Sequence, residues 1–241
     1  IRWRKYISGV YDPLMARALC IRSLTDPSKS VILISADLVG IQYRLAKLAR
    51  VKISEKTKVP INNILIHVTH THSSPDTIGL FPVTIYSDIF RLDVPRNAAL
   101  VAVKGFIEAG VKSFDSATQK FKIGYGTGNE FPEAIAKQRR HPYEQIHDPI
   151  LFIKFTDESD QLLALLVNYQ GHPTLMPQAN TKVSGEYPAK FVQAIHKKLP
   201  ELKFAAYYNG FCGDVSLNLP RSKMNWGFLK ILLLFLPATT G

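Results

Sequence analysis

Cysteine is scarce in this chain of 241 residues, which holds only Cys20 and Cys212. Two cysteines are too few for a disulfide framework, and this excludes a small scaffold held together by several bridges. They can form one disulfide or none, so the cysteine count does not decide between an oxidising and a reducing compartment. A hydrophobic content of 46% with 20% charged residues is typical of a packed globular protein and excludes a disordered one.

A hydrophobic run long enough to cross a membrane is not apparent either. The apolar stretch at residues 228–236 has nine residues, whereas a spanning helix needs about 20. We expect a buried helix or strand there, with an interfacial anchor as the weaker alternative. The sequence begins with Ile1 rather than Met, and no signal peptide can be recognised in it.

The chain has no dense run of like charge, although it is strongly basic overall. Thirty Lys and Arg residues against nineteen Asp and Glu give a formal net charge of +11. A basic protein can bind nucleic acid or an anionic membrane, but the tightest basic groups contain fewer than five residues, which favours ordinary solvated faces. No nucleic-acid-binding motif is present, so we expect no nucleic-acid partner. An anionic membrane surface remains a candidate partner.

Hydrophobic patterning alternates between strands and helices. The polar turn at 157–160 joins two of the expected strands into a β-hairpin, and an apolar strand, an amphipathic helix and a second strand form a βαβ unit between 31 and 68. We therefore predict an α/β fold with a mixed, mainly parallel sheet, flanking helices and a hairpin, built as a single domain over 1–241. The predicted strands are 31–35, 64–68, 121–125, 150–155, 162–169 and 204–208, and the predicted helices are 41–56, 95–114 and 187–199.

Polar side chains follow four of the predicted strands. Because the carboxyl ends of strands line the ligand crevice of α/β sheets, we expect these side chains to converge there. Two of the clusters contain carboxylates, which makes Asp37 and Asp214 candidate substrate-binding residues. The full set is Asp37, His70 with His72, His172, and Asp214 with Ser216.

The pair His70 and His72 is a candidate metal site. In an extended segment the side chains of residues two apart point to the same face, so two imidazoles can bind one metal, or one can bind while the other acts on a substrate. With His172 as a third imidazole, a catalytic zinc with an open position for water is plausible. The alternatives are two polar loop histidines and a structural His172.

Two familiar catalytic patterns are missing. The chain has no G-x-S-x-G nucleophile elbow of α/β-hydrolases, and Ser216 taken alone is typical of a turn serine. The glycine-rich segment 124–128 is not followed by a helix that carries Lys and Ser or Thr, which argues against a phosphate-binding loop.

Taken together, the motifs resemble the N-terminal catalytic domain of the neutral/alkaline non-lysosomal ceramidase family. The most specific match is Thr-His-Thr-His-Ser-Ser-Pro at 69–75, which is similar to the family's THTHSGP. Family-like segments occur in order along most of the chain, at 9–18, 35–37, 69–75, 139–142, 172–185 and 213–218.

The resemblance implies a zinc-dependent amidohydrolase that cleaves an N-acylsphingosine (ceramide), or a related N-acyl lipid, into a fatty acid and an amine. It implies that His70 and His172 ligate zinc and that His72 lies beside the metal as a catalytic residue. Arg140 is implied as a substrate-site residue. Ser216 matches the serine assigned either as nucleophile or as the group that holds the substrate's primary hydroxyl.

The sequence differs from the family motifs at several positions, and these differences affect what can be expected of the protein. Ser74 and Asp76 replace family glycines, and Glu186, Leu217 and Arg139 replace an Asp, a Pro and an Asn. The family's remaining zinc ligands, a Glu and a Tyr, lie downstream of the matched segments, so we expect the domain to be incomplete at its C-terminus. The resemblance favours a secreted or membrane-associated protein. The alternative function is a truncated or degenerate, catalytically weak domain that binds anionic lipid surfaces.

Overall fold

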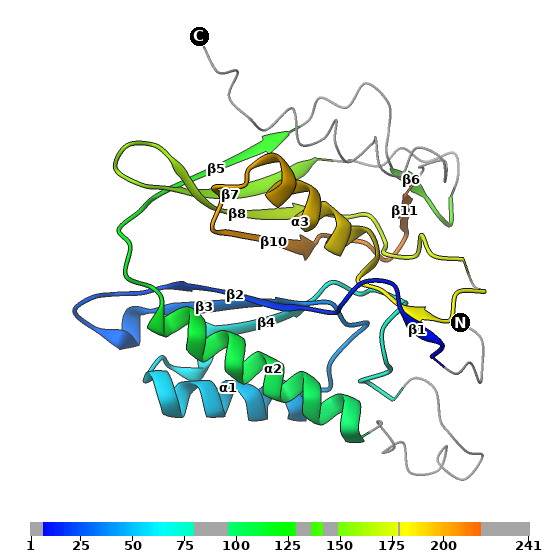
Figure 1. Cartoon of the computed structure of the whole chain (residues 1–241), viewed down its shortest axis with the longest axis horizontal. Coiled ribbons are helices and arrows are strands. Elements are labelled where there is room, and N and C mark those ends of the chain that lie inside the picture. The colour runs from blue at the N-terminus through cyan, green and yellow to red at the C-terminus, as the bar shows by residue number, and fades with distance from the viewer. Residues whose placement is uncertain (1–6, 80–95, 129–135, 142–148, 178, 218–241) are drawn as a thin grey trace. The chain divides into compact units, whose positions relative to one another are not determined.

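The computed structural model describes residues 7–79, 96–128, 136–141, 149–177 and 179–217 (Figure 1). The chain divides into two compact units. The first unit contains Ile1–Gln119 and Met176–Glu186, and the second contains Lys120–Leu175 and Tyr187–Gly241. The backbone therefore leaves the first unit, returns to it for a short segment, and leaves it again.

The first unit is a three-stranded sheet covered by two helices on one face (Figure 1). Its strand order is β2-β3-β4, with β2 antiparallel and β4 parallel to the central strand β3. A short parallel pair, β1 with β9, ties the returning segment to the N-terminal part of this unit. The elements are β1 (Gly9–Val10), β2 (Ala16–Ile21), η1 (Pro27–Lys29), β3 (Val31–Ala36), α1 (Tyr43–Thr57), η2 (Ile61–Asn63), β4 (Ile64–Val68), α2 (Arg96–Asp115) and β9 (Lys182–Val183).

Helix–sheet packing in the first unit explains a glycine inside helix α2. Ile32 and Ile34 of β3 are fully buried against Ile53 of α1 and Phe106 of α2. A Cβ at Gly110 would come within 2.8 Å of the Ile53 side chain. Glycine weakens a helix interior by roughly 1 kcal/mol, but here it lets the two helices approach closely over the sheet.

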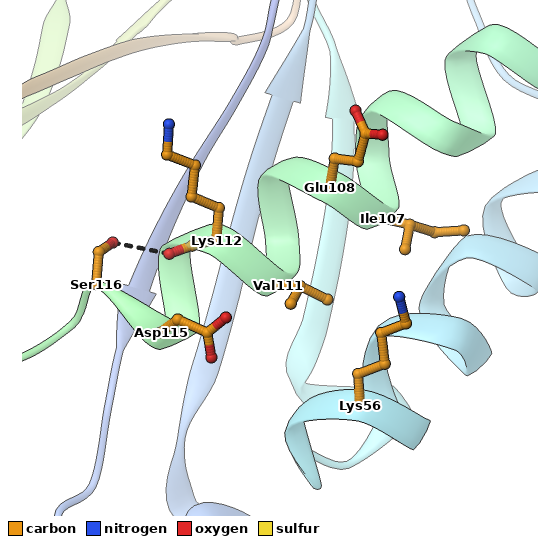
Figure 2. A pocket seen from close by; sticks show the side chains of 7 residues that line it. All are labelled: Lys56, Ile107, Glu108, Val111, Lys112, Asp115 and Ser116. Atoms are coloured by element: carbon orange, nitrogen blue, oxygen red, sulfur yellow. Dashed lines mark hydrogen bonds between the residues drawn. The ribbon is translucent and has the colours of Figure 1, made fainter.

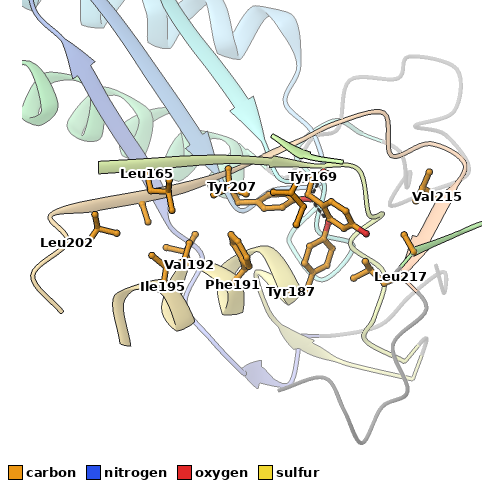
Figure 3. Packing of buried hydrophobic residues seen from close by; sticks show 14 residues of the cluster. Leu165, Tyr169, Tyr187, Phe191, Val192, Ile195, Leu202, Tyr207, Val215 and Leu217 are labelled. Atoms are coloured by element: carbon orange, nitrogen blue, oxygen red, sulfur yellow. Dashed lines mark hydrogen bonds between the residues drawn. The ribbon is translucent and has the colours of Figure 1, made fainter. Parts of the chain in front are cut away.

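The second unit is a four-stranded sheet of order β10-β8-β7-β5, together with a separate two-stranded pair, β6 with β11. Helix α3 packs its apolar stripe, which includes Phe191, Val192 and Ile195, against Leu165 and Tyr207 of the sheet (Figure 3). The elements are β5 (Lys122–Gly128), β6 (Ala136–Gln138), β7 (Ile150–Thr156), β8 (Leu162–Tyr169), α3 (Glu186–Lys198), β10 (Phe204–Asn209) and β11 (Val215–Leu217).

The predicted α/β class, the βαβ unit and the hairpin are confirmed. The balance within the sheets differs from the expectation of mainly parallel pairing, because four of the seven strand pairs within the described part of the chain are antiparallel. Part of the difference comes from β2, which the sequence pattern did not predict. No helix in the described ranges is long and apolar enough to cross a membrane. Pro95 and residues 228–236 lie outside the described residues.

His67 on β4 makes the stability of the first unit sensitive to acid. Burial lowers the pKa of its imidazole to about 4, below the ordinary value near 6.5. Ser35 on the neighbouring strand lies with its Oγ 3.3 Å from the ring Nδ1. Because the folded state holds the neutral ring, its contribution to stability is complete above pH 6.5 and is lost as the pH falls towards 4.

We predict that replacing His67 with Gln reduces the loss of unfolding free energy between pH 7 and pH 4.5. Urea denaturation of wild type and variant at both pH values measures this difference. The matched control is His141→Gln, which removes an exposed imidazole and should keep the pH dependence of the wild type. An equal acid sensitivity in wild type and His67→Gln would contradict the assignment.

Candidate functional site

The histidine loop, residues 69–74, follows β4 in the first unit. The backbone N–H of Thr69 donates to the carbonyl of Ala36, 2.8 Å away, so the loop leaves the sheet beside the end of β3. His70 then adopts a left-handed backbone conformation with φ of 64°, which costs a non-glycine residue roughly 1–2 kcal/mol. The bonds made by the neighbouring residues offset this strain.

The imidazole of His70 is held by the backbone of Val39. Its Nδ1 lies 2.7 Å from the Val39 carbonyl oxygen, which can only accept, so Nδ1 carries the proton and Nε2 keeps its lone pair. The Val39 N–H donates to the hydroxyl of Ser74 at 2.9 Å. Ser74 therefore fixes the residue that orients His70.

His70 and His72 converge on each other through Nε2. These two nitrogens are 3.4 Å apart, and the rings meet edge to face with centroids 5.0 Å apart. Two nitrogen ligands about 2.05 Å from a tetrahedral zinc ion would lie roughly 3.3 Å from each other, so the separation fits two ligands of one metal. The predicted convergence is thus observed, but through the left-handed turn at His70 rather than through an extended strand.

The returning segment 176–186 braces the histidine loop. The Thr71 hydroxyl donates to the Ser184 carbonyl at 2.7 Å, and the Ser184 N–H donates to the Ser73 carbonyl at 2.9 Å. The buried carboxylate of Glu186 accepts from the Ser73 hydroxyl at 3.1 Å. Asp12 in turn accepts from the Ser184 hydroxyl and the Gly185 N–H. Sequence-distant polar groups therefore hold the loop in one conformation.

Asp37, a predicted substrate-binding residue, is only 1% exposed. Its Oδ2 accepts from the Arg17 guanidinium at 2.9 Å and from the Met15 N–H at 3.0 Å. Burial raises the pKa of this carboxyl, and the nearby Arg17 charge opposes that shift. These contacts connect the end of β3 to β2, and a substrate role for Asp37 stays a prediction.

In the second unit, the imidazole of His172 is oriented by a backbone carbonyl, as that of His70 is in the first. Its Nδ1 lies 2.8 Å from the carbonyl oxygen of Cys212, which again leaves Nε2 as the nitrogen with a lone pair. The His172 backbone N–H donates to the Val215 carbonyl at 3.0 Å, and the residue forms a parallel bridge with Ser216. The side chain is buried, so its orientation is set by the protein and not by solvent.

Two buried tyrosines anchor the chain just before His172. The hydroxyl of Tyr187 on α3 donates to the Gly171 carbonyl and contacts the Tyr207 hydroxyl. The Tyr207 hydroxyl also lies 2.6 Å from the Tyr169 carbonyl. Burial, followed by the proximity of Tyr207, raises the pKa of Tyr187 well above its ordinary value, so the phenol stays protonated. Gly171 is required by space, because a Cβ there would lie 2.5 Å from Leu217.

The remaining predicted site residues gather around the β6–β11 pair. Ser216 on β11 is half-buried and pairs with Lys137 of β6. Asp214 and Arg140 are exposed, and Gln138 lies between them. Its amide nitrogen donates to the Asp214 carboxylate at 2.8 Å, and its amide oxygen accepts from the backbone N–H of Arg140 at 2.8 Å. The structure thus brings Asp214 and Arg140 together through a residue that the sequence did not single out.

Sequence reasoning also missed the carbonyls of Val39 and Cys212, the Tyr187 hydroxyl and the brace at Ser184. Two of these groups are backbone atoms, and no residue type encodes their role. Tyr187 carries a weak signal, as an aromatic residue at the start of a predicted helix, but its partner Gly171 lies sixteen positions earlier. Only the tertiary fold reveals these contacts.

We predict that Tyr187→Phe lowers the unfolding free energy of the protein by about 1–3 kcal/mol, because the Gly171 carbonyl loses its buried donor. Denaturant titration followed by circular dichroism measures the change. Tyr125→Phe is the control, since Tyr125 is 89% exposed and its hydroxyl can bond to water. Equal unfolding free energies of the two variants would show that the hydrogen bond from the Tyr187 hydroxyl does not stabilise the fold.

Comparisons with known proteins support the fold alone. No protein-family model and no curated protein matches the sequence. The structure is similar to that of neutral ceramidase from Pseudomonas aeruginosa, with a TM-score of 0.73 and 18% identity over 94% of this chain and 39% of that one. It is also similar to a ceramidase complexed with C2, with a TM-score of 0.67 and 20% identity over 85% of this chain and 33% of that one. The chain therefore spans less than two fifths of the length of either protein, and its fold is ceramidase-like.

Proposed function

We propose that the protein is a zinc-dependent hydrolase of the neutral ceramidase type, which cleaves the amide bond of an N-acylsphingosine or a related N-acyl lipid. The observation that carries the proposal is the shared geometry of His70 and His172. Each donates Nδ1–H to a backbone carbonyl, at 2.7 and 2.8 Å, and so presents Nε2 as a metal ligand.

The fold likeness adds independent support. The match to neutral ceramidase covers 94% of the chain and so includes residues of both units. We propose on this basis that residues 1–241 act as one catalytic domain. The ordered sequence motifs resemble the same family, and the most specific of them coincides with the histidine loop.

The donor set fits zinc. His70 and His172 are the proposed ligands, and His72, with its Nε2 3.4 Å from the Nε2 of His70, would lie beside the ion. A bound zinc ion would polarise the amide carbonyl and lower the pKa of a water molecule to about 7. Neutral imidazole is the form that binds metal, and the Val39 and Cys212 carbonyls select the tautomer that does so.

Amide hydrolysis requires a proton to move from the attacking nucleophile to the leaving amine. The C–N bond breaks, the acyl carbon gains the nucleophile's oxygen, and the amine nitrogen takes up the proton. We assign this transfer to His72, whose ring meets that of His70 edge to face, because imidazole is the side chain most often used in general acid–base catalysis. Arg140, Asp214 and Asp37 are proposed as polar contacts for the substrate.

Ser216 has two candidate roles, as nucleophile or as the group that holds the substrate's primary hydroxyl. Its position in register with His172 puts it beside a proposed metal ligand and suits either role. The two roles differ in kinetics, because a lost nucleophile lowers kcat, whereas a lost positioning contact that is equal in ground and transition states raises KM.

We predict that purified protein equilibrated with zinc and then freed of excess metal retains the ion, and that His70→Ala and His172→Ala each lose most of it. Metal analysis by mass spectrometry measures the ratio of zinc to protein. Cys212→Ala is the matched control, because it keeps the backbone carbonyl that orients His172 and removes only the thiol. Zinc content unchanged by both histidine variants, or lost in Cys212→Ala, would contradict the histidine site.

We predict that the zinc-loaded protein releases fatty acid from a fluorescent N-acylsphingosine, and that His72→Gln lowers kcat by roughly 10²–10⁴-fold. For Ser216→Ala, comparison of a substrate with and without the primary hydroxyl separates its two roles: only a nucleophile is needed for both substrates. Absence of turnover with zinc still bound would refute the hydrolase function and leave the metal site standing.

A further inference from the structure

We propose that the outer face of the α1–α2 layer, defined as the exposed surface of these two helices, docks on an anionic lipid bilayer. This face lies on the first unit and is distinct from the histidine loop. It carries exposed apolar side chains, unneutralised positive charge and a shallow apolar hollow between the two helices.

Large apolar side chains occupy positions where an ordinary surface helix carries polar ones. On α2, the neighbours Leu100 and Val101 are 61% and 71% exposed. On α1, Tyr43 and Leu48 are 70% and 43% exposed. Single exposed apolar residues are common, but a group of them on two packed helices marks an interaction surface.

Positive charge predominates on helix α1, which carries two of these apolar residues. Helix α1 contains five basic residues and one acidic residue, Glu55. Lys52 pairs with Glu55 at 2.8 Å, and on α2 Lys104 pairs with Glu108 at 3.6 Å. Arg44 and Lys47 are exposed and form no ion pair within the described part of the chain. Their charge is available to an anionic partner.

A hollow of about 600 Å³ continues this face towards the C-terminal ends of both helices (Figure 2). Its lining combines the apolar side chains of Ile107 and Val111 with two basic residues, Lys56 and Lys112, and two acidic ones, Glu108 and Asp115, so the hollow adds apolar surface to this face and no net charge. Because α1 and α2 contribute their C-terminal residues to the same hollow, the two helices run in the same direction and their N-terminal apolar residues share the other end of the face.

This combination fits a lipid surface better than a nucleic acid. Interfacial helices place Lys and Arg around an apolar group that enters the headgroup region, whereas a nucleic acid is bound through phosphate contacts that need no Leu or Val. Each basic side chain near an anionic leaflet strengthens binding about fivefold, and burial of exposed Leu and Val adds to that.

Membrane docking does not require catalysis. A bilayer is where a lipid amide substrate would reside, so docking would bring the first unit to its substrate. Binding itself is measured without turnover or metal, which keeps failure of this inference distinguishable from failure of the proposed function.

The test is cosedimentation of the full chain with vesicles of equal parts phosphatidylcholine and phosphatidylserine, against vesicles of phosphatidylcholine alone. We expect binding to the anionic vesicles at low salt that weakens as salt screens the charge. The double variant Arg44→Gln/Lys47→Gln should weaken binding about thirtyfold, as two basic contacts are lost. Leu100→Ser/Val101→Ser should weaken it about tenfold with the salt dependence unchanged.

Lys197→Gln/Lys198→Gln on α3 is the matched control, because it removes the same charge from the second unit and should change binding less than twofold. Thermal unfolding checks that each variant keeps its fold. The proposal is overturned by absence of binding to anionic vesicles at low salt, by equal weakening in the α1 and α3 charge variants, or by unchanged binding in the Leu100/Val101 variant, which would indicate charge-only attraction of the kind a nucleic acid also provides.

Discussion

A hydrogen bond from Nδ1–H of an imidazole to a backbone carbonyl is the interaction on which the candidate site depends. It occurs twice, at His70 with Val39 and at His172 with Cys212. In each case it fixes the tautomer and the ring orientation together, and the nitrogen with the lone pair is left facing away from the support. Without it, a neutral histidine would divide its population between two tautomers, of which one offers the wrong nitrogen.

The loop that carries each histidine is held in place by a different kind of contact in each unit. In the first unit, a strained turn at His70 is stabilised by polar contacts to the returning segment, above all between Thr71 and Ser184. In the second, a buried phenol at Tyr187 holds the Gly171 carbonyl, and the bridge to Ser216 fixes the residue that follows. Both solutions use buried hydrogen bonds to position a loop, since buried polar groups left unpaired are costly.

Much of the fold could be predicted from periodicity. The apolar runs at 31–35, 64–68 and 204–208 favour strands that are at least partly buried, because burial removes apolar surface from water. Strand β2 escaped prediction since its residues, which include Arg17, are mostly half-buried and show no clean alternation. The candidate histidines could be found from their spacing and from the family resemblance. The Gln138 link, the Val39 and Cys212 carbonyls and the positive φ at His70 could not, because these arise when distant parts of the chain meet and leave no local pattern.

The use of main-chain oxygen as the support for both imidazoles has a consequence for how such a site can change over evolutionary time. Every amino acid carries a carbonyl, so the side chains at positions 39 and 212 are free to vary as far as packing allows, while the ring orientation survives. Mutational drift would then erase sequence similarity around the site faster than it erases the site. The fold likeness to ceramidases at 18–20% identity shows how far a sequence can diverge while a fold persists, and main-chain support lets the orientation of an imidazole tolerate divergence at the residue that supports it.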